Sequence, residues 1–177
     1  YIILAIVVVL VLWVVGAFNI LVRARNRVKE AWSDINVQLR RRHDLIPNLV
    51  ETVKGYVTHE ASVLEAVTKA RTEAVSAGSL AQKGQAENML SGALGKLFAL
   101  SEAYPTLKAN ENFMKLQDEL TDTEDKIQAA RRFYNSNVMD FNTKLEGFPT
   151  NMFAASLGFT REELFQLGSA EEAKLPE

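Results

Sequence analysis

The stretch TLKANENFMKLQDELTDTEDKIQAARRFYNSNVMDFNTKLE, residues 106–146, contains neither glycine nor proline and carries one apolar stripe along its length. Its apolar residues recur at spacings of three, four or seven, which is the period of one helix face. They are Phe113, Leu116, Leu120, Ile127, Ala130, Tyr134, Val138, Phe141 and Leu145. Pro105 ends the preceding helix and Gly147-Phe148-Pro149 ends this one. The stretch therefore predicts one helix of roughly 39 residues, about 58 Å long.

A second apolar stripe lies in the N-terminal third of the chain. It consists of Val28, Trp32, Ile35, Leu39, Ile46, Leu49, Val53 and Tyr56 or Val57. Pro47 lies inside this stripe, but the register survives across it, which favours a kinked, continuous helix. The alternative is that Asp44 caps a new helix with Pro47 in its first turn.

Two shorter helices are predicted between these stripes, one from near Thr58 to Gly78 and one from Leu80 to about Tyr104. Four helices joined by short links make an antiparallel, up-and-down bundle. The predicted fold class is therefore all-α, with the bundle over residues 23–147 and a separate tail over residues 148–177.

The first 22 residues contain no ionisable side chain except the phenol of Tyr1. As a helix, Tyr1 to Val22 reaches about 33 Å, enough to cross a hydrocarbon core of about 30 Å. The run is longer than the apolar core of a signal peptide, which has about 7 to 15 residues. It predicts a transmembrane helix that continues into the bundle. Because the sequence does not begin with Met, we expect residues upstream of Tyr1 in the native chain.

Basic residues follow the apolar run directly, at Arg23, Arg25, Arg27 and Lys29. Positive charge resists translocation, so the sequence predicts an outside N-terminus and a body that faces the cytoplasm. The opposite topology would need stronger basic residues upstream of Tyr1. Lys and Arg number 20 against 22 Asp and Glu, a balance that does not point to a nucleic-acid partner.

Catalytic chemistry would depend on the two histidines, His43 beside Asp44 and His59 beside Glu60. Neighbours in a helix point to different sides, so adjacency does not orient a histidine by its carboxylate. His59 also lacks the second histidine four residues on that a zinc-binding helix needs. The absence of cysteine excludes thiolate metal sites, disulfides and lipoprotein acylation. We predict no catalytic, cofactor or metal site and no enzymatic activity, and interpret both histidines as surface or helix-end residues.

The triplet Arg40-Arg41-Arg42 can be interpreted as a lipid-headgroup patch or as a set of ion pairs. In an upright helix it lies about 27 Å from the last span residue, well beyond a Debye length of about 8 Å. Antiparallel register places it near Glu124, Asp125 and Gln128 instead. Ion pairs between the first and last helices are the better interpretation.

Two groups of small or polar residues interrupt the helices. Gly92 and Gly95 each cost about 1 kcal/mol relative to alanine in a helix. We interpret them as a site of close helix approach, with a hinge or a subunit contact as the alternative. The asparagines at 135, 137 and 142 form a polar edge of the last helix, or a buried network with Asp34 or Asn36.

The tail over residues 148–177 is rich in large apolar side chains before it becomes acidic. The candidate interaction residues are Phe148, Met152, Phe153, Leu157, Phe159 and Phe165, with Leu164 beside them. Thr160-Arg161-Glu162-Glu163 matches a capping box and predicts a short helix. Antiparallel topology returns the tail to the membrane end of the bundle. There it completes the bundle core, or meets the bilayer surface or a neighbouring subunit.

Several long matches carry a resemblance to a known family. They are Ala31-Trp32-Ser33-Asp34-Ile35-Asn36-Val37-Gln38-Leu39-Arg40-Arg41-Arg42, Asp44-Leu45-Ile46-Pro47-Asn48-Leu49-Val50, Tyr104-Pro105-Thr106-Leu107-Lys108-Ala109, Arg132-Phe133-Tyr134-Asn135, Phe141-Asn142 and the tail. The chain resembles the LemA family over nearly its whole length. The resemblance implies a bacterial inner-membrane protein with one N-terminal span and a cytoplasmic four-helix domain. The family lacks an established biochemical function, and a magnetosome-associated member hints at membrane organisation.

These observations favour a non-enzymatic, membrane-anchored scaffold that forms homo-oligomers or organises other membrane proteins. The alternative hypothesis is a cytoplasmic sensor or regulatory adaptor for a membrane protease or stress system.

Overall fold

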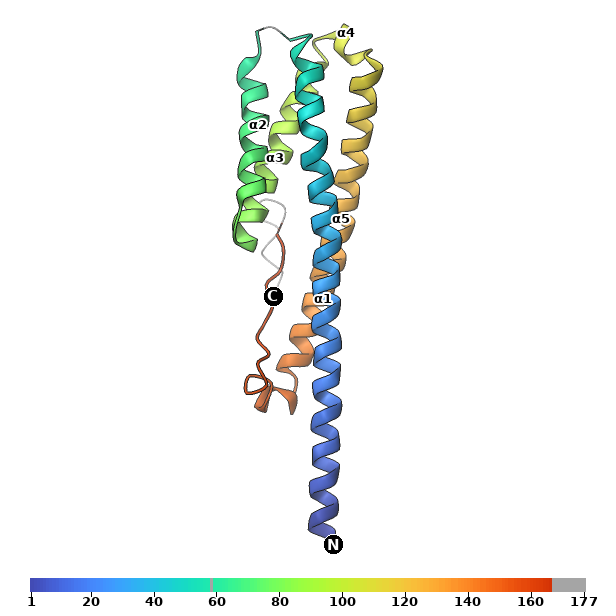
Figure 1. The fold of residues 1–177 in the computed structure, drawn as a ribbon, viewed down its shortest axis with the longest axis vertical. Coiled ribbons are helices and arrows are strands. Elements are labelled where there is room, and N and C mark those ends of the chain that lie inside the picture. The colour runs from blue at the N-terminus through green and yellow to red at the C-terminus, as the bar shows by residue number, and fades with distance from the viewer. Residues whose placement is uncertain (58, 167–177) are drawn as a thin grey trace, which may run out of the picture. The chain divides into compact units, whose positions relative to one another are not determined.

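A computed structural model describes residues 1–57 and 59–166 of the chain, which contain helices and turns but no strand (Figure 1). The predicted all-α class is confirmed. The elements are α1 (Ile2–Lys54), α2 (Ala61–Ser76), α3 (Leu80–Ser101), α4 (Pro105–Lys108), α5 (Glu111–Glu146) and a 3-10 turn η1 (Thr150–Met152).

Contacts divide the chain into two compact units. Among the described residues, the anchor unit comprises 1–34 and 132–164, and the bundle unit comprises 35–57, 59–131 and 165–166. Both long helices are shared between the units: α1 passes from the anchor unit to the bundle unit after residue 34, and α5 passes from the bundle unit to the anchor unit after residue 131.

The bundle unit has a core of aliphatic and aromatic side chains from α1, α2, α3, α4 and α5. Its buried members include Ile46, Leu49, Val53, Val57, Leu64, Val67, Leu90, Leu94, Leu97, Leu107, Phe113, Leu116 and Leu120. Ile46, Leu49, Val53 and Val57 belong to the predicted stripe of the first helix, and Phe113, Leu116 and Leu120 to that of the last, because each stripe buries one face. Val57 is buried whereas Tyr56 is partly exposed, which settles the choice between these two residues.

The first helix is continuous through Pro47, as the surviving register predicted. A new helix capped by Asp44 is therefore wrong. The side chains on both sides of the proline, Ile46 and Leu49, are buried in the bundle core. Packing of the apolar face offsets the backbone hydrogen bond that proline cannot donate.

Helix boundaries follow local capping chemistry. Ser79 and Gln82 form a capping box that starts α3, with each side chain bonded to the other residue's backbone at 3.2 Å. Asn110 Oδ1 accepts the amide of Phe113 at 2.9 Å and starts α5. The predicted helix of roughly 39 residues is thus the four-residue α4 followed by the 36-residue α5.

The anchor unit combines the N-terminal part of α1 with the C-terminal half of α5 and the tail. One face of α1 is buried at Leu21, Ala24, Val28 and Ala31. The side chains before Leu21 are mostly exposed and apolar. Among the described residues, α1 is the one helix long and apolar enough to cross a membrane.

The predicted short helix from Thr160 is wrong, because residues 159–166 are not helical. The helical turn of the tail lies earlier, at Thr150–Met152. The side chain of Asn142 explains the difference. Its amide donates to the Glu162 carbonyl and its carbonyl accepts the Glu162 amide, both at 3.0 Å. These two bonds occupy the backbone groups of Glu162 that a helix would use.

Candidate functional site

Aromatic contacts attach the tail to the apolar part of α1 within the anchor unit. Phe153 lies 5.5 Å from Trp13 with an interplanar angle of 86°. Phe159 lies 5.5 Å from Phe18 and 6.4 Å from Phe141 of α5. These separations lie in the favourable range for edge-to-face pairs. Two of the candidate interaction residues thus contact the predicted span.

In the basic cluster after the span, one residue contacts the tail and three are exposed to solvent. The guanidinium of Arg25 lies 4.9 Å from the centroid of the Phe159 ring, a cation–π arrangement. Arg23, Arg27 and Lys29 are exposed. One of the four predicted flanking cations therefore helps to hold the tail, and three face solvent.

Polar bonds complete the attachment of the tail to α5. The Tyr134 hydroxyl donates to the Glu163 carbonyl at 2.9 Å, next to the Asn142 bonds with Glu162. Burial raises the pKa of Tyr134 to about 12, with smaller contributions from the charges of Glu162 and Glu163. Two of the asparagines of α5 have different environments. Asn142 is buried against the tail, whereas the side chain of Asn137 donates a hydrogen bond to the Phe133 carbonyl of its own helix.

The remaining candidate residues of the tail have different environments. Phe148 is 82% exposed and Met152 is 75% exposed, while Leu157 and Leu164 are partly exposed. Phe159 and Phe165 are buried, and Phe165 belongs to the bundle unit. The tail thus contributes one buried phenylalanine to the anchor unit and one to the bundle unit, while its other large apolar side chains named here are exposed or partly exposed.

A buried charge network lies inside the bundle unit. Arg42 is 1% exposed and makes ion pairs with Glu87, which is 0% exposed, and with Glu124. It also donates to Ser91 Oγ at 2.7 Å. The predicted ion pairs between the first and last helices are present at Arg42–Glu124 and at Arg41–Asp122, 3.5 Å apart.

The interpretation of His43 as a surface residue is wrong. Its Nε2 lies 2.6 Å from Glu87 Oε1, and only 12% of its side chain is exposed. Arg71 donates from Nε to the His43 carbonyl at 2.7 Å. Glu87, which the sequence analysis did not single out, therefore joins Arg42 and His43 in one network.

The pKa of Glu87 lies below its ordinary value of 4.5. Burial raises this pKa, but the hydrogen bond with His43 and the charge and hydrogen bond of Arg42 together lower it by more. A carboxylate with a depressed pKa in the folded state stabilises the fold above its unfolded pKa. That contribution is lost as pH falls through the folded pKa.

We therefore expect the free energy of unfolding of the chain to fall as the pH is lowered below 4.5. The Glu87→Gln variant should lose less of its free energy of unfolding over the same fall in pH. The measurement is urea denaturation followed by helical circular dichroism across that interval. Equal losses in the wild type and in Glu87→Gln would contradict the assignment of this titration to Glu87.

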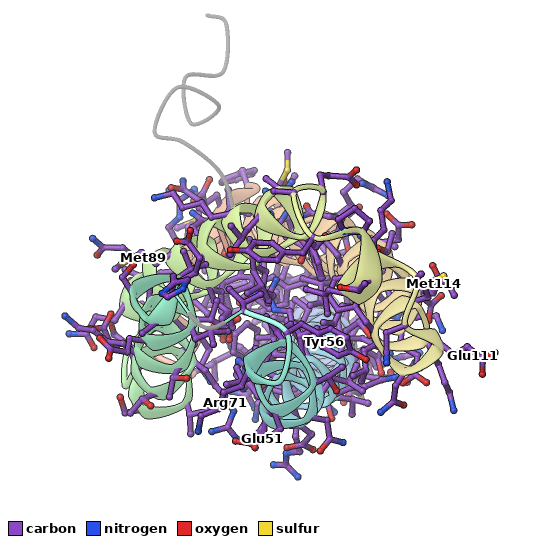
Figure 2. The ribbon with its side chains drawn as sticks, turned by 90° about the horizontal axis from the view of Figure 1, so that it is seen from above. Glu51, Tyr56, Arg71, Met89, Glu111 and Met114 are labelled. Atoms are coloured by element: carbon purple, nitrogen blue, oxygen red, sulfur yellow. The ribbon has the colours of Figure 1, made fainter. Side chains whose placement is uncertain are left out.

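Close helix approach at Gly92 and Gly95 is wrong. A Cβ atom at either position would meet nothing among the described residues within 4 Å, and both glycines are exposed. Met89, three residues before Gly92, is also exposed at the rim of the bundle (Figure 2). The hinge and the subunit contact remain as the interpretations of these glycines.

Gly84 is the glycine at which the backbone approaches closely. A Cβ there would collide with the Gln166 carbonyl and touch the buried ring of Phe165. We expect Gly84→Val to displace residues 165–166 from α3 and to increase proteolysis of the tail, because a backbone atom cannot yield as a flexible side chain can. The control is Gly92→Val, where space is open. Equal protection of the tail in both variants would contradict this role for Gly84.

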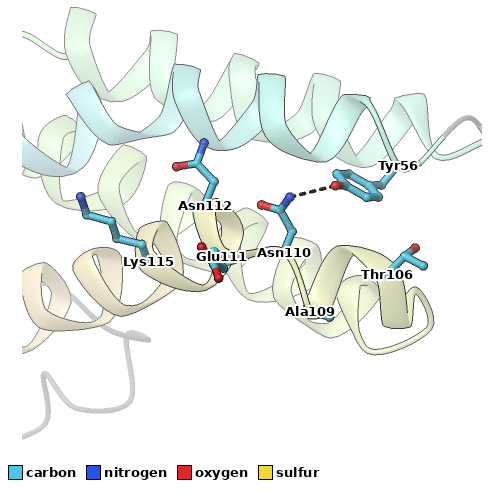
Figure 3. A pocket seen from close by; sticks show the side chains of 7 residues that line it. All are labelled: Tyr56, Thr106, Ala109, Asn110, Glu111, Asn112 and Lys115. Atoms are coloured by element: carbon cyan, nitrogen blue, oxygen red, sulfur yellow. Dashed lines mark hydrogen bonds between the residues drawn. The ribbon is translucent and has the colours of Figure 1, made fainter.

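Two grooves mark the surface of the bundle unit. The first, of about 650 Å³, lies beside Asn110, whose side chain donates to the Tyr56 hydroxyl at 2.8 Å (Figure 3). Its charged side chains, Glu111 and Lys115, are exposed, which is typical of a surface groove.

The second groove, of about 510 Å³, opens on the charge network. Its lining is Asn36, Leu39, Arg40, His43, Asp44, Arg71, Ala74, Val75, Lys83 and Glu87. The Glu87 carboxylate is already bonded to Arg42 and His43, so it is not available as a general base in this arrangement. Within residues 1–57 and 59–166, no group of three or more His, Asp or Glu residues could hold a metal ion.

Comparison with known proteins gives consistent matches. The model of the LemA family matches residues 31–177. Protein LemA of Metamycoplasma hominis is 30% identical over 161 residues, which cover 89% of this chain and 72% of that protein. Magnetosome protein MamQ 2 of Paramagnetospirillum magneticum is 27% identical, over 84% of this chain and 64% of the relative.

A further relative, magnetosome protein MamQ of Magnetospirillum gryphiswaldense, is 26% identical over 75% of this chain and 58% of its own length. The chain therefore spans about three fifths of the length of these magnetosome relatives. With the family model matched over most of the sequence and the helical fold in agreement, this chain belongs to the LemA family.

Proposed function

We propose that the protein is a non-enzymatic, membrane-anchored scaffold at the cytoplasmic face of a bacterial inner membrane. It assembles with copies of itself or organises other membrane proteins there. The observation that carries this proposal is the anchor unit, in which Phe153 and Phe159 pack on Trp13 and Phe18 of the apolar helix. The span and the tail then act as one body rather than as a tether and a separate domain.

The chemistry of the bundle unit supports a structural role. Its most deeply buried charges, Arg42 and Glu87, form an ion pair with each other. The similarity to proteins named as magnetosome proteins supports a role at a membrane.

The mass of the full chain in mild detergent tests the proposal. A scaffold runs as a large homo-oligomer, whereas a regulatory adaptor runs as a monomer or dimer until its partner arrives. Light scattering with detergent subtraction measures this mass. A uniformly monomeric chain with intact helical circular dichroism would reject self-assembly and favour the adaptor.

Topology is tested with single cysteines, because residues 1–177 contain none. We expect an impermeant thiol reagent to leave Ser33→Cys unlabelled in intact cells and to label it after lysis. Ser33 is exposed and follows the basic cluster, which resists translocation. Labelling of Ser33→Cys before lysis would reverse the proposed orientation.

A further inference from the structure

The tail tip, residues 148–157, exposes the large apolar side chains of Phe148, Met152 and Leu157. Among the large apolar side chains of the described residues, Phe148 is exceeded in exposure only by Tyr1, and Met152 follows directly after Ile2 and Ile3. In water such a surface is unfavourable, so something of apolar character is expected to cover it. The geometry of the anchor unit indicates what that covering is.

Ring contacts fix the depth of the tail tip along α1. Phe153 meets Trp13, which lies well inside the apolar run, and Phe159 meets Phe18 about one and a half turns nearer the body. Gly158, with a φ of 78°, adopts the left-handed conformation that turns the chain back between these two contacts. The tail tip therefore lies beside apolar residues of the span.

Ionisable side chains are likewise absent from the tail tip and from the part of α1 beside it. From Phe148 to Thr160 the tail contains no ionisable side chain, and α1 contains none from Ile2 to Val22. The charges of the anchor unit begin outside these segments, with the exposed ion pair Arg161–Glu146 at 2.9 Å and with the cluster after Val22. A bilayer can accept the uncharged end and exclude the charged remainder.

The tail tip also satisfies much of its own backbone. Backbone carbonyls from Gly147 to Ala155 accept hydrogen bonds from backbone amides of the same segment. The donors are Asn151, Met152, Phe153, Ala154, Leu157, Gly158 and Phe159. Internal bonding of this kind is what a non-helical segment needs near hydrocarbon, where water is scarce. An irregular turn is still unsuited to the bilayer centre, so the interface is the depth it fits.

We propose that the tail tip is a second membrane-contacting element, lying at the headgroup–acyl boundary at the depth of Trp13, with lipid covering Phe148 and Met152. Trp13 then occupies the position that tryptophan favours at membrane interfaces. This inference rests on the proposed membrane anchoring and adds the surface through which the tail engages the lipid.

The test uses the full chain in phosphatidylcholine–phosphatidylglycerol vesicles with an environment-sensitive fluorophore on one cysteine. The cysteine replaces Phe148 or Met152, whose exposure makes substitution harmless to the fold. Glu163→Cys is the water-exposed control on the same tail, and Ile6→Cys is the control inside the span. Lipids that carry a nitroxide near the headgroup, or near the acyl-chain end, serve as quenchers.

We expect probes at positions 148 and 152 to emit to the blue of the Glu163→Cys probe and to be quenched most by the shallow nitroxide. The Ile6→Cys probe should be quenched most by the deep one. Emission like that of Glu163→Cys would overturn the lipid contact. A third outcome is blue emission that the nitroxide lipids do not quench but that changes on dilution with unlabelled protein. It would identify a second copy of the chain as the covering and would also overturn the lipid contact.

The controls separate this inference from the proposed function. If the Ile6→Cys probe is not quenched by either lipid, the anchoring itself fails. If that probe is quenched while those at 148 and 152 are not, the anchoring stands and the contact of the tail tip with lipid is rejected.

Discussion

Replacing Arg42 by methionine is expected to destabilise the chain by about 3–5 kcal/mol, the range for removing one partner of a buried ion pair. The loss is large because Glu87, with 0% of its side chain exposed, keeps its charge without the guanidinium that neutralises it. Hydrogen bonds to Ser91 and Glu124 disappear as well. Urea denaturation in detergent, followed by helical circular dichroism, measures the effect.

The chain offers a matched control in the adjacent arginine. Arg41 pairs with Asp122 at 3.5 Å, and both side chains are close to half exposed, so Arg41→Met should cost no more than about 1 kcal/mol. The double variant Arg42→Met/Glu87→Gln should recover much of the loss, because it removes the uncompensated charge. Equal stability of the two single methionine variants would refute the buried network.

Replacing Tyr134 by alanine is expected to cost about 3–5 kcal/mol, as for other large aromatic side chains removed from a core. Tyr134 is 4% exposed, its ring lies 5.5 Å from that of Trp32, and its hydroxyl holds the Glu163 carbonyl. Trp32 is only partly buried, so Trp32→Ala should cost less than Tyr134→Ala. Burial thus reverses the order that aromatic size alone suggests.

Tyr134→Phe serves as the control, because it removes the hydrogen bond to Glu163 and keeps the ring. It should cost about 0.5–1.5 kcal/mol. The same denaturation measurement applies to all three variants. A loss for Tyr134→Ala no larger than that for Tyr134→Phe would show that the packing of α1 on α5 in the anchor unit is not as described.

The helices could be predicted because their apolar stripes are long and regular. The last helix keeps one period from Phe113 to Leu145, and packing of that face outweighs local preferences. Continuity of α1 through Pro47 was predictable for the same reason. The separate α4 was harder to predict, since Asn110 acts as a cap without interrupting any apolar pattern.

The buried network carried a signal that the sequence analysis did not use. Arg42 lies three residues after Leu39 and four before Ile46, so it occupies a position of the apolar stripe, unlike Arg40 and Arg41. Glu87 similarly lies three residues before Leu90 and seven before Leu94. Opposite charges in two apolar stripes point to a buried pair, because an isolated buried charge is too costly.

The tail could not be predicted to the same extent, because its conformation depends on contacts distant in sequence. The capping box at Thr160 describes a local preference, but the bonds of Asn142 to Glu162 outweigh it. Close approach was expected at Gly92 and Gly95 but occurs at Gly84, since composition does not reveal which backbone a glycine faces. Which apolar side chains remain exposed likewise depends on the folded geometry.

Disulfide crosslinking between copies tests the central claim most directly, namely that the chain assembles with its spans together. Single cysteines are placed in turn from Ile2 to Val15, since residues 1–177 contain no cysteine, and membranes are oxidised mildly. We predict crosslinked dimers that recur with the period of a helix face, about every 3.6 residues. Equally weak crosslinking at every position, in a chain that is inserted and folded, would contradict self-assembly through the anchor.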